Sequence, residues 1–189
     1  MANKLTVGMI LGMASVLTGM GIARAERAVR ADTAEAPRAL AADEAAIDRT
    51  LKAMYDSISG PVGRERDWGA FDRVFHPDGR MVAYWIQPDG TSASREMTAA
   101  EYRDQIGPQL VEAGFTETQL HRVIEVYGSV AHAFSTYRGE FTTPAPQIIE
   151  GINSVQLIKT DDGWRVYSLV WQQADETLPI PDRYRPEAD

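Results

Sequence analysis

The first regular pattern of apolar residues after residue 43 has the spacing of an α-helix. Between Glu44 and Ser59 they occur every third or fourth position, which predicts one helix with a single buried stripe. The members of this stripe are Ile47, Leu51, Met54, Tyr55 and Ile58. A second, shorter helix is predicted from Asp67, as its N-cap, to Phe75, where a proline and a glycine in the next four residues turn the chain.

A third helix is predicted to begin at a capping box. Thr98 and Glu101 have the spacing at which each side chain caps the other residue's backbone amide. The Gly107-Pro108 pair is expected to kink or interrupt this helix, because proline lacks the amide hydrogen that a helix uses. Gly114 is expected to end it.

The rest of the pattern indicates strands. Arg80 to Ile86 is predicted as the first strand, and Gln87 to Arg95 as a polar loop. Four more strands are expected near Thr116–Tyr127, Val130–Phe141, Gly151–Thr160 and Trp164–Gln173. Helices followed by a run of strands indicate an α+β fold with an antiparallel sheet. Because both faces of the late strands carry apolar residues, one face should cover the helices and the other should form a homodimer through the sheet.

The N-terminus has the pattern of a signal peptide over residues 1–25. Leu5 to Ile22 is apolar and uncharged, and Ala23-Arg24-Ala25 supplies the small residues of a cleavage site. We therefore expect an exported protein, periplasmic or secreted after cleavage near Ala25. An uncleaved leader would instead anchor the chain in a membrane. Residues 26–42 are interpreted as a flexible linker, 43–175 as one domain and 176–189 as a proline-rich C-terminal tail.

Composition narrows the chemistry. The 189 residues carry a net charge of -8, so the surface should repel phosphate backbones, and nucleic acid is not an expected partner. The absence of cysteine excludes disulfides, thiolate nucleophiles and zinc–sulfur sites. The three histidines lack the short spacing of a metal site, and no phosphate-binding glycine loop occurs, so neither a metal nor a cofactor is predicted.

Several stretches carry a family resemblance. They are Phe71–Gly79 (FDRVFHPDG), Val130–Tyr137 (VAHAFSTY), Gly151–Leu157 (GINSVQL) and Gly163–Val166 (GWRV). With the order of predicted elements, they make the chain from Asp43 to Gln173 resemble the nuclear transport factor two-like (NTF2-like) superfamily, in its SnoaL-like branch. The resemblance implies a cone-shaped, curved antiparallel sheet wrapped on about three N-terminal helices. It also implies an apolar pocket with a few polar groups.

Alternation along one predicted strand suggests a general base. If His132 faces the pocket, Phe134 and Thr136 face it too, and the small side chains of Ala131, Ala133 and Ser135 lie on the opposite face. A neutral imidazole beside an apolar wall can act as a general base near neutral pH. The alternative is a buried histidine that hydrogen-bonds to a neighbouring strand.

Two further polar candidates follow from the resemblance. By strand order, Asn153 resembles the position where steroid-isomerase relatives place an acid that donates a hydrogen bond to an oxyanion, and an amide can donate in the same way. The alternative is an asparagine that satisfies strand backbone. Those relatives carry their catalytic carboxylate in the first strand, but the matching Val82 to Trp85 has no acid. Tyr84 is the candidate substitute there, with packing at the pocket rim as the alternative.

Large aromatic residues are candidates for the pocket walls. They are Tyr55, Trp68, Tyr102 and Trp171, together with Phe134 and Thr136 of the strand above. For the aromatic residues the alternative is an ordinary place in the core.

Two function hypotheses remain. The first is an exported domain that binds a small apolar or mixed-polarity molecule and has no catalytic role. The second is a cofactor-independent lyase, isomerase or hydrolase, with His132 as the base and Asn153 polarising a carbonyl. The fold alone does not choose between them.

Overall fold

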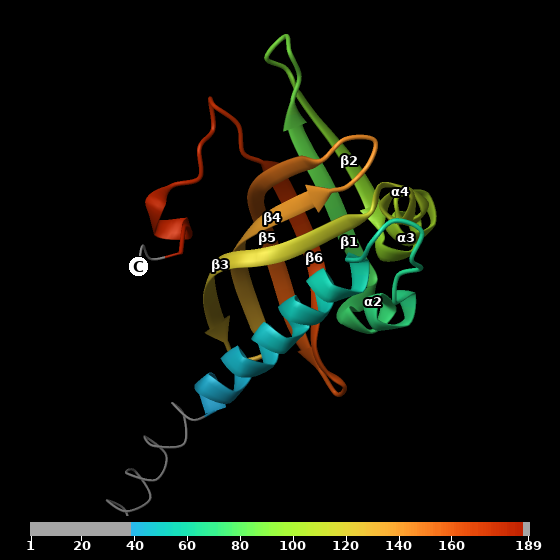
Figure 1. Ribbon diagram of the computed structural model, residues 1–189. Coiled ribbons are helices and arrows are strands. Elements are labelled where there is room, and N and C mark those ends of the chain that lie inside the picture. The colour runs from blue at the N-terminus through green and yellow to red at the C-terminus, as the bar shows by residue number, and fades with distance from the viewer. Residues whose placement is uncertain (1–38, 187–189) are drawn as a thin grey trace, which may run out of the picture. The chain divides into compact units, whose positions relative to one another are not determined.

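The computed structural model describes residues 39–186, which form a long helix, three short helices and a six-stranded sheet (Figure 1). The long N-terminal helix covers residues 39–58. The later elements are α2 (Trp68–Val74), β1 (Phe75–Ile86), β2 (Ser92–Thr98), α3 (Ala99–Gln105), α4 (Gly107–Ala113), β3 (Phe115–Tyr127), β4 (Val130–Phe141), β5 (Gln147–Thr160), β6 (Gly163–Gln173) and the 3₁₀ turn η1 (Asp182–Tyr184). The leader predicted over 1–25 lies outside the described residues, whereas residues 39–42 of the predicted linker are helical.

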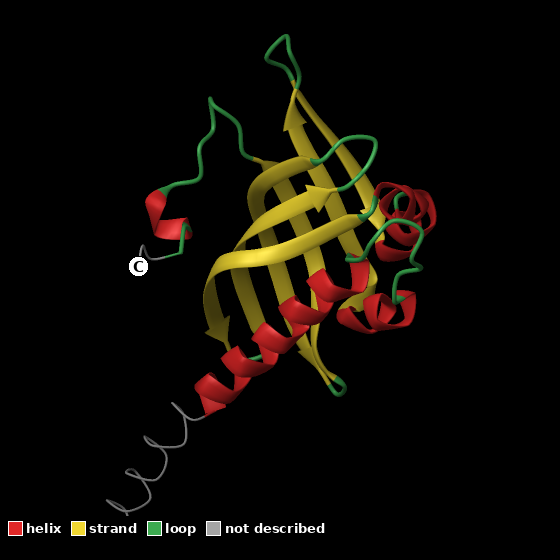
Figure 2. Cartoon of the chain, in the orientation of Figure 1, coloured by secondary structure: helices red, strands yellow, loops and turns green. Residues whose placement is uncertain are grey.

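The strands form one curled sheet in the order β2-β1-β6-β5-β4-β3 (Figure 2). Neighbours are antiparallel, with one exception that the sequence did not predict: β1 and β6 run parallel. This pairing places the first strand beside the last, so β2, α3, α4 and β3–β5 all lie in the connection between them. The expected α+β fold with a cone-like sheet is confirmed. The segment predicted as a loop from Gln87 is wrong in its second half, because Ser92 onward pairs with β1.

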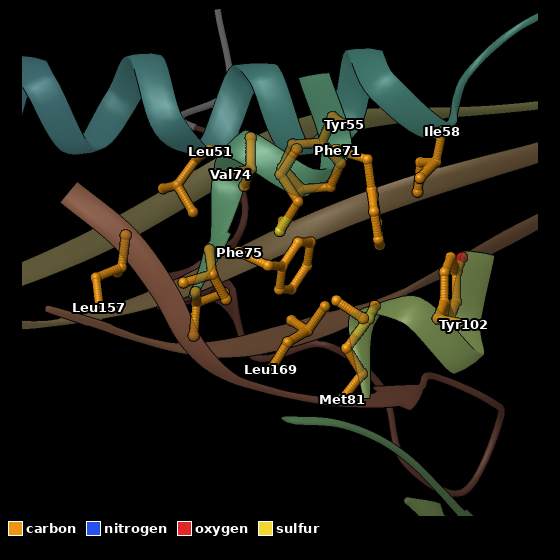
Figure 3. Packing of buried hydrophobic residues seen from close by; sticks show 14 of the residues in the cluster. Leu51, Tyr55, Ile58, Phe71, Val74, Phe75, Met81, Tyr102, Leu157 and Leu169 are labelled. Atoms are coloured by element: carbon orange, nitrogen blue, oxygen red, sulfur yellow. The ribbon is translucent and has the colours of Figure 1, made fainter. Parts of the chain in front are cut away.

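The N-terminal helix packs across the inner face of the sheet. Its predicted stripe is buried, with Ile47 and Leu51 fully inaccessible to solvent. Figure 3 shows Leu51, Tyr55 and Ile58 pointing from this helix toward residues of α2, α3 and the sheet. Opposite the helix, β4 presents the small residues Ala131, Ala133 and Ser135, all buried. Small side chains allow the helix to approach the strands closely, as in other close-packed interiors.

The short helices have the predicted ends. The Asp67 side chain accepts a hydrogen bond from the Ala70 amide, and the Thr98–Glu101 capping box forms in both directions. The proline-containing pair at Gly107 separates α3 from α4, as expected. Gly114 ends α4 in the left-handed region at φ 65°, a conformation that glycine adopts without a steric penalty. These ends place β3 directly after the helical layer.

A bulge in β3 reverses the side-chain alternation in the middle of that strand. Gln119 pairs with Tyr137, but His121 already pairs with Thr136, so Leu120 is an extra residue. Before the bulge, Phe115 and Glu117 face inward with Phe115 buried. After it, the even-numbered Ile124 and Val126 pack against the core. The bulge therefore lets one strand bury both sets of residues.

The C-terminal segment after β6 crosses the outer face of the sheet. The Ala174 amide donates to the Glu150 carbonyl at the start of this segment, and the Thr136 hydroxyl donates to the Tyr184 carbonyl near its end. Between them Ile180 is buried. The outer face is therefore partly covered by the chain itself.

Among residues 39–186, no helix has the length and apolar character required to cross a membrane.

Candidate functional site

A cavity of about 370 Å³ lies between the inner face of the sheet and the helices. Its walls are mostly apolar and aromatic, with a few polar groups, as in many small-molecule sites. The lining residues are Met54, Tyr55, Ile58, Phe71, Phe75, Met81, Ala83, Trp85, Arg95, Met97, Tyr102, Ile106, Leu110, Phe115, Glu117, Tyr137, Phe141, Ile149, Asn153, Leu169 and Trp171.

Glu117 supplies the carboxyl group of this cavity. It lies on β3 two residues after buried Phe115, and its backbone amide donates to the Ser59 hydroxyl (2.8 Å) at the end of the N-terminal helix. Burial raises the pKa of the Glu117 carboxyl from its ordinary value of 4.5 to about 7, while the hydrogen bond from Asn153 partly opposes the rise. Near neutral pH, this group therefore exists in both protonated and ionised forms.

The Asn153 amide connects Glu117 to the N-terminal helix. Its Nδ2 donates to Glu117 Oε1 (3.1 Å) and lies 3.1 Å from the Tyr55 hydroxyl, to which it also donates. The Tyr55 hydroxyl in turn lies 2.7 Å from the hydroxyl of Ser135. Three strands and one helix thus contribute to a continuous buried network. Such a network fixes its members in place because any lost partner would leave a buried polar group unpaired.

Two more tyrosines face the same space. Burial, and then the nearby Glu117 carboxylate, raise the pKa of both Tyr102 and Tyr137, so both hydroxyls stay protonated at neutral pH. Neither hydroxyl is hydrogen-bonded to another residue within 39–186 of the structure. Each is therefore free to donate to a bound molecule.

A separate, polar groove of about 460 Å³ reaches the same carboxyl from the other side. It runs between the N-terminal helix and β3, and Tyr55 and Glu117 line both hollows. Asp48, Asp56 and His121 are among its other lining residues. Glu117 therefore stands between an apolar cavity and a polar groove: its carboxyl is desolvated, although the residue as a whole is partly exposed.

Four predicted residues line the cavity. Tyr55, Tyr102, Trp171 and Asn153 all contribute to its walls. Trp68, in contrast, packs edge-on against Phe71 with ring centroids 5.6 Å apart. Its indole nitrogen donates to Glu65 outside the cavity (2.7 Å), so Trp68 has the alternative role of a core residue.

The expected orientation of β4 was wrong. His132 lies on the outer face, where its Nε2 is 3.3 Å from the Ser154 hydroxyl, and it does not line the cavity that contains Asn153. Phe134 packs against the Tyr184 ring of the C-terminal segment, and Thr136 bonds to the same residue. The reason is steric: the closely packed helix selects the small residues of β4 for the inner face.

Tyr84 also lies on the outer face. It lines a hollow of about 300 Å³ beneath the C-terminal segment, together with Phe134 and Ile180. On β1 the inward residues are instead Met81, Ala83 and Trp85, which line the inner cavity. Tyr84 is therefore not placed to replace a first-strand carboxylate in that cavity.

Glu117 is the site residue that the sequence reasoning missed. The available signal was its alternation with Phe115 at the start of a predicted strand, which placed an acid on the same face as a large apolar residue. This signal is short, because the bulge at Leu120 reverses the alternation of inward and outward residues three positions later. The sequence pattern of the whole strand therefore does not show that Glu117 faces inward.

Within the described part of the chain, no group of three or more histidine or acidic residues is arranged to hold a metal ion.

The raised pKa of Glu117 predicts a pH-dependent stability. Between about pH 4.5 and 7 the folded protein keeps a proton that the unfolded chain releases, so the free energy of unfolding should fall as pH rises through this window. Above about pH 7 the free energy of unfolding should level off, about 3 kcal/mol below its value at pH 4.5. Glu117→Gln should remove this part of the pH dependence and be more stable than wild type at pH 8, as measured by urea unfolding. Parallel curves for the two proteins would contradict the assignment.

The comparisons with known proteins concern the fold. No protein-family model matches the sequence, and no curated protein matches it. Solved structures do match. A protein of unknown function from Mycobacterium tuberculosis has a TM-score of 0.58 and 17% identity, over 77% of this chain and 80% of its own.

Two other solved structures match this chain over nearly the whole of their own length. An NTF2-like superfamily protein from Salmonella enterica serovar Typhimurium has a TM-score of 0.56 and 16% identity, over 76% of this chain and 95% of its own. A protein from Kribbella flavida has a TM-score of 0.54 and 15% identity, over 74% of this chain and 97% of its own. With the curled six-stranded sheet and its helical layer, these likenesses show that the chain has the fold of the NTF2-like superfamily.

Proposed function

We propose that this protein binds a small, largely apolar molecule in the inner cavity. The observation that carries the proposal is a cavity of about 370 Å³ with apolar and aromatic walls and one buried carboxyl group. Convergent polar groups in an apolar hollow give a ligand both affinity and orientation. The fold is compatible with this role, but the support for the proposal comes from the residues that line the cavity.

The mouth of the cavity offers a test with a matched control. Ala83 lines the cavity and is partly exposed, whereas its neighbour Val82 is not a lining residue. Ala83→Trp should fill the mouth and weaken binding of decanol, a neutral apolar probe, by about tenfold or more in calorimetry. Val82→Trp should leave the affinity unchanged. If decanol does not bind wild-type protein, or binds both variants equally well, the cavity is not the binding site.

A second candidate function is proton transfer without a cofactor, as in an isomerase, lyase or hydrolase. The observation that favours it is a carboxyl group with a pKa of about 7 beside the tyrosine hydroxyls of Tyr102 and Tyr137. Ionised Glu117 can remove a proton from carbon, and a protonated tyrosine can donate to the oxyanion that forms. The polar groove gives the carboxyl a route to exchange that proton with solvent.

Hydrogen–deuterium exchange tests the second candidate. The α-hydrogens of a methyl ketone with an octyl chain should exchange in deuterated buffer faster with the protein than without it. Glu117→Gln should reduce the accelerated rate by at least about a hundredfold, the usual scale of a lost general base. His132→Ala is the control, because His132 lies outside the cavity. Equal rates for wild type and Glu117→Gln would contradict proton transfer by this group.

We also propose export and placement in the SnoaL-like branch, on the sequence patterns alone. The uncharged apolar run from Leu5 to Ile22 and the Ala23-Arg24-Ala25 site support export to the periplasm or the medium. N-terminal sequencing of the mature protein should begin at Glu26. A mature protein that retains Met1 would contradict cleavage.

A homodimer through the sheet is a further proposal. The outer face carries exposed apolar side chains, including Val130, Ile148 and Val170, beside the area that the C-terminal segment covers. Apolar surface of this kind favours association. Sedimentation of the mature protein should give twice the mass of one chain, and Ile148→Lys should shift it toward the monomer. A monomer at all concentrations would contradict the proposal.

A further inference from the structure

The inner cavity has charged side chains at two places only among its lining residues. One is Glu117 on β3 and the other is Arg95 on β2. Every other lining side chain is apolar, aromatic or neutral. A molecule that enters this space therefore meets one cationic and one titrating group, and their positions decide which end of the molecule lies where.

Arg95 lies at the open end of the cavity. On β1 the inward side chains become more exposed toward the hairpin turn, from Met81 at 3% to Trp85 at 45%. On β2 the same trend runs from buried Met97 to exposed Arg95, which pairs with Ala83 across the hairpin. Figure 1 shows this β1–β2 hairpin projecting beyond the rest of the sheet. The guanidinium thus belongs to the mouth, where Ala83 leaves space beside it.

Arg95 forms no ion pair within the described residues. The Glu101 carboxylate senses its charge but is bound to the amide and hydroxyl of Thr98. The Nη2 of Arg95 donates to the side-chain oxygen of Gln105, a neutral amide on α3. By contrast, Arg80 on β1 lies 3.5 Å from Glu96, and Arg103 on α3 lies 2.8 Å from Asp72. An arginine fork can bind both oxygens of a carboxylate, which gives direction as well as affinity. The fork at the mouth is therefore available to an anion.

We propose that the ligand of this cavity is an amphipathic monoanion: an apolar body with one carboxylate, bound with the carboxylate at Arg95 and the apolar end toward Glu117. This inference rests on the proposed binding function and names its ligand class. The reverse orientation would place the carboxylate against Glu117, and two carboxyl groups in an apolar space oppose each other's ionisation. The surrounding wall contains no other cation to compensate.

The test compares two probes that share one apolar chain. Decanoate and decanol are titrated into wild type, Arg95→Gln and Arg80→Gln at pH 7.5 by calorimetry. Wild type should bind decanoate about tenfold more tightly than decanol. Arg95→Gln should lose that preference by weakening decanoate binding while leaving decanol unchanged. Arg80→Gln, which removes another exposed arginine of the same hairpin outside the cavity, should keep the preference.

The possible failures are distinguishable. If neither probe binds wild type, both the proposed function and this inference are overturned. If both bind with equal affinity and Arg95→Gln changes neither, the binding function stands and the carboxylate assignment is wrong. If Arg95→Gln weakens both probes equally, Arg95 acts on the shape of the mouth and not on the charge of the ligand, which also overturns the assignment.

Discussion

The amide of Asn153 joins two polar groups inside an apolar space, and it is the side-chain hydrogen-bond partner of the Glu117 carboxyl among residues 39–186. It donates to the Glu117 carboxyl and to the Tyr55 hydroxyl, and Tyr55 continues the network to Ser135. Burying a carboxyl group without partners is costly, and no basic residue of the described chain forms an ion pair with Glu117. The protein meets this cost with a neutral donor, so the carboxyl remains poised between its two protonation states. The chemistry available to the cavity follows from that balance.

The position of this network determines what can reach it. The apolar cavity and the polar groove meet at Tyr55 and Glu117, one on each side. A ligand can displace water from the cavity while the groove still connects the carboxyl to solvent. Ser59, which accepts a hydrogen bond from the Glu117 backbone amide, ties this part of β3 to the end of the N-terminal helix. The packing of the helix against the sheet therefore places the Glu117 carboxyl where it lines both the cavity and the groove.

Much of the fold could be predicted from local chemistry, because helix caps and apolar stripes act over a few residues. Asp67, the Thr98–Glu101 box and Gly114 all occupy the predicted ends of their helices. The parallel pairing of β1 with β6 could not be predicted in this way, since it depends on contacts between distant parts of the chain. For the site, Tyr55, Tyr102 and Trp171, which were predicted as pocket walls, line the cavity, and so does Asn153, which was predicted as a polar group of the pocket.

The errors in the site share one cause. Alternation gives the two faces of a strand but does not say which face is inside, and a bulge exchanges the faces within one strand. For β4 the choice depended on the space left by the N-terminal helix, which small residues such as Ala133 suit and His132 does not. For β3 the extra residue Leu120 hid the inward position of Glu117. The choice of face on β4 depends on tertiary packing, and on β3 the one local signal, the alternation of Phe115 with Glu117, ends at the bulge.

The ionisation of Glu117 is the property on which the proposed chemistry of the cavity depends most, and carboxyl ¹³C NMR measures it directly. With glutamate labelled at the side-chain carboxyl, the Glu117 signal can be assigned from its absence in Glu117→Gln and followed through a pH titration. The account predicts a midpoint of about 7 for this signal. A midpoint at the ordinary value of 4.5 would show a well-solvated carboxylate and would contradict the proposed site.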